Sequence, residues 1–153
     1  MSTIALELIR VGFDAKLKVG DIIEFDNRKA VIILIYNSIW QYWKKVPNIK
    51  CDAIVQFVDS SDETIEYKEI AEITEQHKHG EEQLRKPNDV VSINNNNDIH
   101  RAYYRVSSIE NIKYNFVDLE VTYNFELIKE WPKYMVDKAV QANRRSNFKI
   151  VKR

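Results

Sequence analysis

Short apolar runs separated by polar turns follow one another along this chain. Ile22–Phe25 and Ala53–Val58 each lie between two aspartates, and Ala30–Tyr36 is followed by Asn37. Residues 116–125 alternate between polar and apolar side chains, which is the period of a half-buried strand. The pattern therefore predicts a mainly β (α+β) protein, and it leaves open whether Ile70–Gln76 is strand or helix.

A helix is expected at each end of the chain. Over residues 1–17, the spacing of Ile4, Leu8 and Val11 places them on one helical face, with Ser2 or Thr3 as the cap. Over residues 129–153, Pro132 suits the first turn of a helix because the missing N–H has no partner there. An apolar stripe then follows, made of Trp131, Met135, Ala139 and Ala142.

The same sequence pattern occurs twice. Residues 18–27 (KVGDIIEFDN) match residues 86–95 (KPNDVVSINN) in the lysine, the aspartate, the apolar pair after it and the final asparagine. Each copy predicts a turn, a short strand, a second turn and a second strand. We therefore expect two tandem small β-barrel or meander units, at residues 18–76 and 88–128, joined by a linker over residues 77–87.

The first copy resembles the opening strand of SH3-like small barrels, including the KOW and Tudor groups. The resemblance rests on Val19-Gly20-Asp21-Ile22-Ile23-Glu24-Phe25 and covers about residues 18–70, while the second copy has Asn88 in place of Gly20. It implies a non-catalytic module that binds peptides, proteins or nucleic acid, and it assigns no role to any particular residue.

Composition and charge narrow the possible functions. Basic and acidic residues balance at 23 each, which argues against a polyanion binder held by bulk electrostatics. The single cysteine, Cys51, excludes an intramolecular disulfide and fits a reducing compartment. The sequence has no apolar run long enough for a membrane span, and its first residues do not resemble a secretory signal. We expect a soluble protein without a membrane partner, in the cytoplasm or, if viral, in the virion.

The most suggestive functional segment lies near residue 40, in an expected loop between strands. It combines large aromatic side chains with two lysines: Trp40, Tyr42, Trp43, Lys44 and Lys45. Three interpretations stay open: Ile39, Trp40 and Tyr42 close the end of a small core, the aromatics anchor a protein partner, or they stack nucleic-acid bases. Among the functional interpretations, the protein interface is favoured.

Charged residues separate into blocks of opposite sign. The end of the chain is basic and could contact a phosphate backbone, through Lys138, Arg144, Arg145, Lys149, Lys152 and Arg153. The stretch from Asp59 to Glu82 is acidic, so the two blocks could also be solvated faces or could attract each other between copies.

Nothing in the sequence indicates catalysis, a cofactor or a metal. Cys51 has no nearby histidine, the three glycines are far apart, and His77 and His79 lack a clear third ligand. We therefore expect a non-enzymatic protein-binding or assembly protein, such as a structural subunit of a larger complex or viral particle. The alternative is a nucleic-acid-binding module that uses the aromatic loop and the basic tail.

Overall fold

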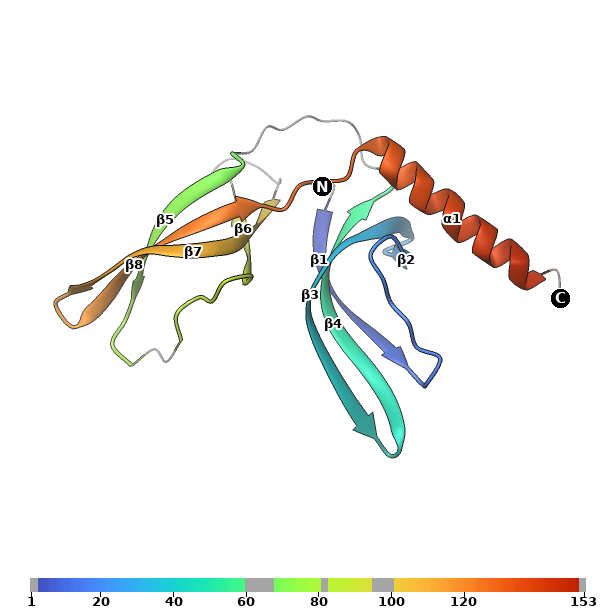
Figure 1. The fold of residues 1–153 in the computed structure, drawn as a ribbon, viewed down its shortest axis with the longest axis horizontal. Coiled ribbons are helices and arrows are strands. Elements are labelled where there is room, and N and C mark those ends of the chain that lie inside the picture. Colours follow the sequence, from blue (N-terminus) through green and yellow to red (C-terminus); the bar gives the residue numbers. More distant parts are fainter. Residues whose placement is uncertain (1–2, 60–67, 81–82, 95–100, 152–153) are drawn as a thin grey trace. The chain divides into compact units, whose positions relative to one another are not determined.

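The computed structural model describes residues 3–59, 68–80, 83–94 and 101–151, and the chain divides into two units. Unit 1 comprises Met1–Asp62 together with Glu130–Arg153, and unit 2 comprises Glu63–Lys129. Each unit contains one curled antiparallel sheet of four strands (Figure 1). The expectation of a mainly β protein is confirmed, and its β structure forms two curled sheets.

The four strands of each unit follow the same order. Sheet 1 has the order β1-β4-β3-β2, and sheet 2 has the order β5-β8-β7-β6. Within each unit the first strand pairs with the last, and the second and third strands form a hairpin. The strands of unit 1 are β1 (Thr3–Val11), β2 (Ile22–Phe25), β3 (Arg28–Trp43) and β4 (Val46–Phe57). Those of unit 2 are β5 (Ile70–His77), β6 (Val90–Asn94), β7 (Arg101–Asn115) and β8 (Asp118–Leu127).

The two sheets also share their irregularities. The β3–β4 pairing shifts register between Ile32 and Leu34 and again between Ile35 and Asn37. The β7–β8 pairing shifts at the equivalent places, between Val106 and Ser108 and between Ile109 and Asn111. Bulges bend a strand at defined positions, so these two pairs explain why both sheets curl alike.

The turn that begins each sequence copy has the same hydrogen bonds in both units. The Lys18 N–H donates to the Asp21 carboxylate at 3.0 Å, and the Lys86 N–H donates to the Asp89 carboxylate at 2.8 Å. The third residue of each turn has a positive φ, 98° at Gly20 and 73° at Asn88. Glycine and asparagine adopt this backbone at the lowest cost, which explains why these two residues replace each other.

The same two turns are bonded to the sheets in the same way. The Gly20 N–H donates to the Ile32 carbonyl, and the Asn88 N–H donates to the Val106 carbonyl, both at 2.8 Å. The reverse bonds, from Ile32 to Asp21 and from Val106 to Asp89, are present as well. The sequence repeat is thus a repeat of backbone structure.

Alternating apolar residues on one face of each sheet form its core, as the period of two requires. In unit 1 the core consists of Leu8, Ala30, Ile32, Cys51, Ala53, Val55 and Phe57. In unit 2 it consists of Ala102, Tyr104, Val106, Val121, Tyr123 and Phe125.

The carboxyl-terminal helix α1 (Lys133–Val151) belongs to unit 1 and contacts β2 and β3. The segment before it is held by Gln56, whose side chain accepts the Trp131 N–H at 2.7 Å and donates to the Trp131 carbonyl at 3.0 Å. Val136 of α1 is buried. The predicted helix at this end is confirmed.

The predicted amino-terminal helix over residues 1–17 is wrong. Thr3–Val11 is strand β1, which pairs with β4 from Thr3↔Gln56 to Val11↔Asn48. Ile4 and Leu8 fit a helical stripe, but Ile4, Leu6 and Leu8 equally fit alternation, and these three face the core. β-branched Thr3, Ile4, Ile9 and Val11 and the positive-φ Gly12 favour the extended form.

The structure also places the unit boundary and the linker at other residues than the sequence predicts. Ile70–His77 is strand β5 and pairs with β8, so it belongs to unit 2 and not to a first unit that ends at residue 76. Residues 77–87, predicted as the linker, instead connect β5 to β6 within unit 2. The polar composition of residues 77–87 indicates a loop correctly, but cannot distinguish a loop inside a unit from one between units.

Candidate functional site

The β3–β4 hairpin carries the aromatic segment that the sequence singled out. We define arm 1 as Asn37–Trp43 of β3 with Val46–Asp52 of β4, paired from Asn37↔Asp52 to Trp43↔Val46. Trp40 and Tyr42 therefore lie in a strand and not in a loop. Arm 1 ends in the hairpin turn at one end of sheet 1 (Figure 1).

Two aromatic side chains of arm 1, Trp40 and Tyr42, face solvent. Trp40 is 69% exposed and Tyr42 is 59% exposed, and their ring centroids are 5.2 Å apart at 58°. They stand two residues apart, on the same face of β3, and half-exposed Ile39, just before Trp40, lies on the other face. The interpretation of these residues as the end of a core is wrong. An exposed pair of large aromatics is typical of a binding surface.

The turn of arm 1 places its two lysines in an unusual backbone conformation. Lys44 and Lys45 have φ values of 48° and 67°, in the left-handed region. Two such residues form the mirror-image turn that matches strand twist, but Asn and Gly adopt it far more readily than lysine. Each lysine here costs stability, and residues kept in such a conformation often serve a functional site.

Arm 1 also has an open edge. Among the residues that the structure describes, β2 pairs with β3 only from Arg28 to Val31, so Asn37–Trp43 has a strand neighbour only on the β4 side. This segment, NSIWQYW, contains no charged residue and no proline. Proteins usually protect edge strands with charges, prolines or bulges, and the two bulges of β3 precede this segment. The edge is therefore suited to accept another strand.

Unit 2 has an equivalent hairpin that sequence reasoning missed. Tyr114 is the third residue after the second bulge of β7, just as Trp40 is the third after the second bulge of β3. Tyr114 is 78% exposed and Phe116, in the turn with a φ of 57°, is 97% exposed. The sequence repeat could have located these residues, because the repeat places a second hairpin at this position. We call Asn111–Asn115 with Asp118–Thr122 arm 2.

Arm 2 differs from arm 1 in charge. Its β7 segment contains Lys113, whose ammonium group is 3.4 Å from the Glu120 carboxylate. Glu110, just before the arm, accepts a hydrogen bond from the Asn124 amide at 2.9 Å. The open edge of arm 2 is thus protected by charge, whereas that of arm 1 is not.

The predicted nucleic-acid residues do not gather with the aromatic ones. Lys138, Arg144, Arg145 and Lys149 lie on α1, while Lys152 and Arg153 fall outside the described residues. Figure 1 shows the start of α1 and the turn of arm 1 at opposite ends of sheet 1. Lys44 and Lys45, by contrast, form the turn of the hairpin that carries Trp40 and Tyr42.

A polar cluster lies against the core of unit 2. Arg85 donates two hydrogen bonds to the Glu75 carboxylate, at 2.7 and 2.9 Å, and these bonds raise the pKa of Arg85. The buried Tyr123 hydroxyl is 2.8 Å from His77 Nε2 and accepts the Arg85 backbone N–H at 3.1 Å. The members of this cluster bond to one another, which supports a structural role.

Metal ligation and nucleophilic catalysis gain no support from the geometry. The described residues contain no group of three or more His, Cys, Asp or Glu side chains placed to hold a metal. The backbone N–H of His79 donates to Asp118, and Cys51 is buried in the core of unit 1. Burial raises the pKa of the Cys51 thiol, which suppresses the reactive thiolate.

No helix in the described part of the chain is long and apolar enough to cross a membrane. Comparisons with protein-family models, curated proteins and solved structures give no match to this chain.

Proposed function

We propose that this chain is a non-catalytic assembly protein in which the β3 edge of arm 1 pairs with the β3 edge of a second copy. The observation that carries the proposal is an uncharged, seven-residue open edge, Asn37–Trp43, beside two exposed aromatic rings. Strand addition gives affinity through main-chain hydrogen bonds and specificity through alternate side chains.

A second copy fits this edge because the edge is self-complementary. Two antiparallel strands related by a two-fold axis present the same residues to each other, so any charge in the segment would face a like charge near the axis. Asn37–Trp43 has none, and the whole chain is close to neutral. Trp40 and Tyr42 would add apolar area to the contact on one face of the joined sheet.

The likeness to SH3-like barrels supports the same class of function. We propose that each unit is a divergent small barrel of this kind, on the grounds of the repeated turn and the curled antiparallel sheet. The likeness implies a binding module without catalysis. Residence in the cytoplasm or in a virion remains a prediction.

The oligomeric state of the purified chain tests the proposal. Analytical ultracentrifugation of the wild type should give a concentration-dependent dimer. Gln41→Lys places a charge on the open edge of arm 1 and should give a monomer. Asn115→Lys is the matched control, since Asn115 holds the equivalent position in arm 2, and it should dimerise like the wild type. A wild-type protein that stays monomeric, or equal loss in both variants, would overturn self-pairing.

Nucleic-acid binding is the second candidate, and Lys44 and Lys45 beside Trp40 and Tyr42 are the observation that favours it. It predicts a gel shift with single-stranded probes that weakens steeply with salt. Lys44→Gln/Lys45→Gln should remove that shift, while deletion of residues 144–153 tests the basic tail separately.

A further inference from the structure

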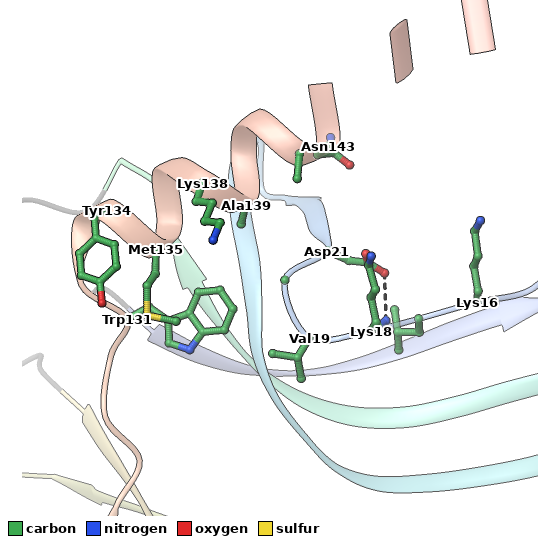
Figure 2. Close-up of a pocket in the computed structure, with 13 residues that line it drawn as sticks. Lys16, Lys18, Val19, Asp21, Trp131, Tyr134, Met135, Lys138, Ala139 and Asn143 are labelled. Carbon is green, nitrogen blue, oxygen red and sulfur yellow. Dashed lines mark hydrogen bonds between the residues drawn. The ribbon is translucent and has the colours of Figure 1, made fainter. Parts of the chain in front are cut away.

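Unit 1 has a pocket that belongs neither to arm 1 nor to the sheet core. It lies between α1 and the residues that lead into β2, and it has a volume of about 600 Å³ (Figure 2). That volume is within the range of small-molecule sites, about 300–1,000 Å³. Its apolar lining consists of Leu17, Val19, Trp131, Tyr134, Met135, Ala139 and Ala142.

The charged residues of the pocket are mostly basic. Lys16 and Lys18 line it from the turn and Lys138 lines it from α1, against a single carboxylate, Asp21. That carboxylate already accepts the Lys18 N–H within the turn, as the dashed line in Figure 2 shows. Lysine stems add apolar surface while their ammonium groups stay at the rim. The pocket thus combines an apolar wall with a cationic rim.

The backbone of the turn has little left to offer a ligand. The N–H groups of Lys18, Gly20 and Asp21 donate to Asp21, Ile32 and Lys18 respectively. An extended peptide would need such main-chain partners. A ligand that needs only apolar contact and a cation fits the pocket better.

We propose that this pocket binds a small carboxylate with an apolar body, of the size of a medium-chain fatty acid. The apolar body would lie along Trp131 and Met135, and its carboxylate would meet the ammonium groups of Lys18 and Lys138. Figure 2 shows Lys138 directed from α1 toward the sheet and Met135 beside the Trp131 ring.

The pocket depends on α1, which lies beside the turn of unit 1. The nearest Trp131 ring carbon is 3.9 Å from the position that a Cβ at Gly20 would occupy, so the indole lies against the turn. The described part of unit 2 has no helix, and its turn presents Asn88 where unit 1 has Gly20. The pocket of unit 1 is therefore formed by α1 together with one of two similar turns.

The test uses the whole chain with Trp40→Phe and Trp43→Phe, so that Trp131 is its only tryptophan. Decanoate, below its micelle concentration, should change Trp131 fluorescence saturably. Acetate supplies the charge without the apolar body, decanol supplies the apolar body without the charge, and a capped Glu-Leu-Glu peptide represents an acidic peptide.

Two pairs of variants identify the site. Ala142→Phe fills the pocket and should abolish decanoate binding, whereas Gln141→Phe, one residue away and outside the lining, should leave it unchanged. Lys138→Gln should weaken binding about fivefold, the size expected for a partly exposed ion pair, and Lys133→Gln should not. Circular dichroism verifies that each variant is folded.

Several results would overturn the proposal. They are the absence of a saturable decanoate response, equal effects of Ala142→Phe and Gln141→Phe, or decanol binding as tightly as decanoate. A response to the acidic peptide alone would also overturn it, in favour of a peptide site.

Discussion

Unit 1 and unit 2 share one hydrogen-bonded frame but present different surfaces. The shared part is the turn with its aspartate, the strand order and the two bulges. These features depend on few side chains, because most of their bonds are made by the backbone. Asp21 and Asp89, with Gly20 and Asn88, are the side chains that the frame requires.

The faces opposite the cores differ most. In unit 1, Val31 and Ile54 on that face are fully buried, and Gln56 beside them bonds to Trp131. In unit 2 the same face carries Thr74 and Thr122, whose hydroxyls are 2.9 Å apart, and buried Tyr103. This face is therefore more polar in unit 2 than in unit 1.

Arm 1 and arm 2 also differ, in the charge of their open edges. Arm 1 ends in Lys44 and Lys45 after an uncharged edge, while the edge of arm 2 includes Lys113. The comparison indicates that two units can share their turn, strand order and bulges while their surface residues differ. Both proposed binding sites lie in unit 1.

The largest expected effect on stability comes from detaching α1 from the sheet of unit 1. Val136→Asp buries a charge on α1 and should cost about 3 kcal/mol or more of the stability of unit 1, because the helix must detach to hydrate it. Hydrogen exchange should accelerate in β2 and β3 but not in β6 and β7. Lys133→Asp, exposed on the same helix, is the control. Uniform acceleration in both units would contradict the assignment of α1 to unit 1.

Removing the aspartate of each turn tests whether the frames are equivalent. Asp21→Ala and Asp89→Ala should each cost about 1–2 kcal/mol, since each deletes one charge-assisted bond to a backbone N–H. Urea denaturation, followed by exchange in each unit, measures both costs. A large cost in one unit and none in the other would show that the turns are not equivalent.

The polar cluster should stabilise unit 2 alone. Tyr123→Phe removes the partner of His77 and of the Arg85 N–H, so it should cost about 1–2 kcal/mol. Thermal unfolding measures the change, and Tyr114→Phe, on the exposed arm of the same unit, serves as the neutral control. Equal effects of the two variants would remove the structural role of the cluster.

The smallest effects on stability belong to the arms. Trp40→Ala and Tyr114→Ala should each change stability by about 0.5 kcal/mol or less, because both side chains are exposed. Trp40→Ala should nevertheless weaken dimerisation, and Tyr114→Ala should not. If circular dichroism finds Trp40→Ala unfolded, arm 1 is part of the folding core and not a docking surface.

Sequence reasoning found the repeat because the frame needs particular residues at particular spacing. Ile22–Phe25 is strand β2 with the predicted bounds, and Asp26 and Asn27, both with positive φ, form the second turn that the repeat predicts. The sequence pattern did not predict the strand at Thr3–Val11, because Ile4 and Leu8 fit both the helical period and the strand period. Only the pairing with β4 decides between the two.

The sequence predicted which residues form the candidate site, but not how they are arranged in space. From the sequence, Trp40 and Tyr42 could be core residues or surface residues, since aromatic side chains suit both. In the structure they lie on the part of β3 that extends beyond β2, where they are exposed. The pocket of unit 1 was not predicted as a site. Its apolar stripe of Trp131, Met135, Ala139 and Ala142 was recognised, but the partner of that stripe, the Lys16–Asp21 segment, is distant in sequence.

Photo-cross-linking at equivalent positions of the two arms tests the central claim most directly. A benzophenone amino acid replaces Gln41 in one purified protein and Asn115 in another. We expect a covalent dimer from position 41 and little or none from position 115, because the edge of arm 1 is uncharged and the edge of arm 2 carries Lys113. A dimer formed equally well from position 115, or from neither position, would contradict the account.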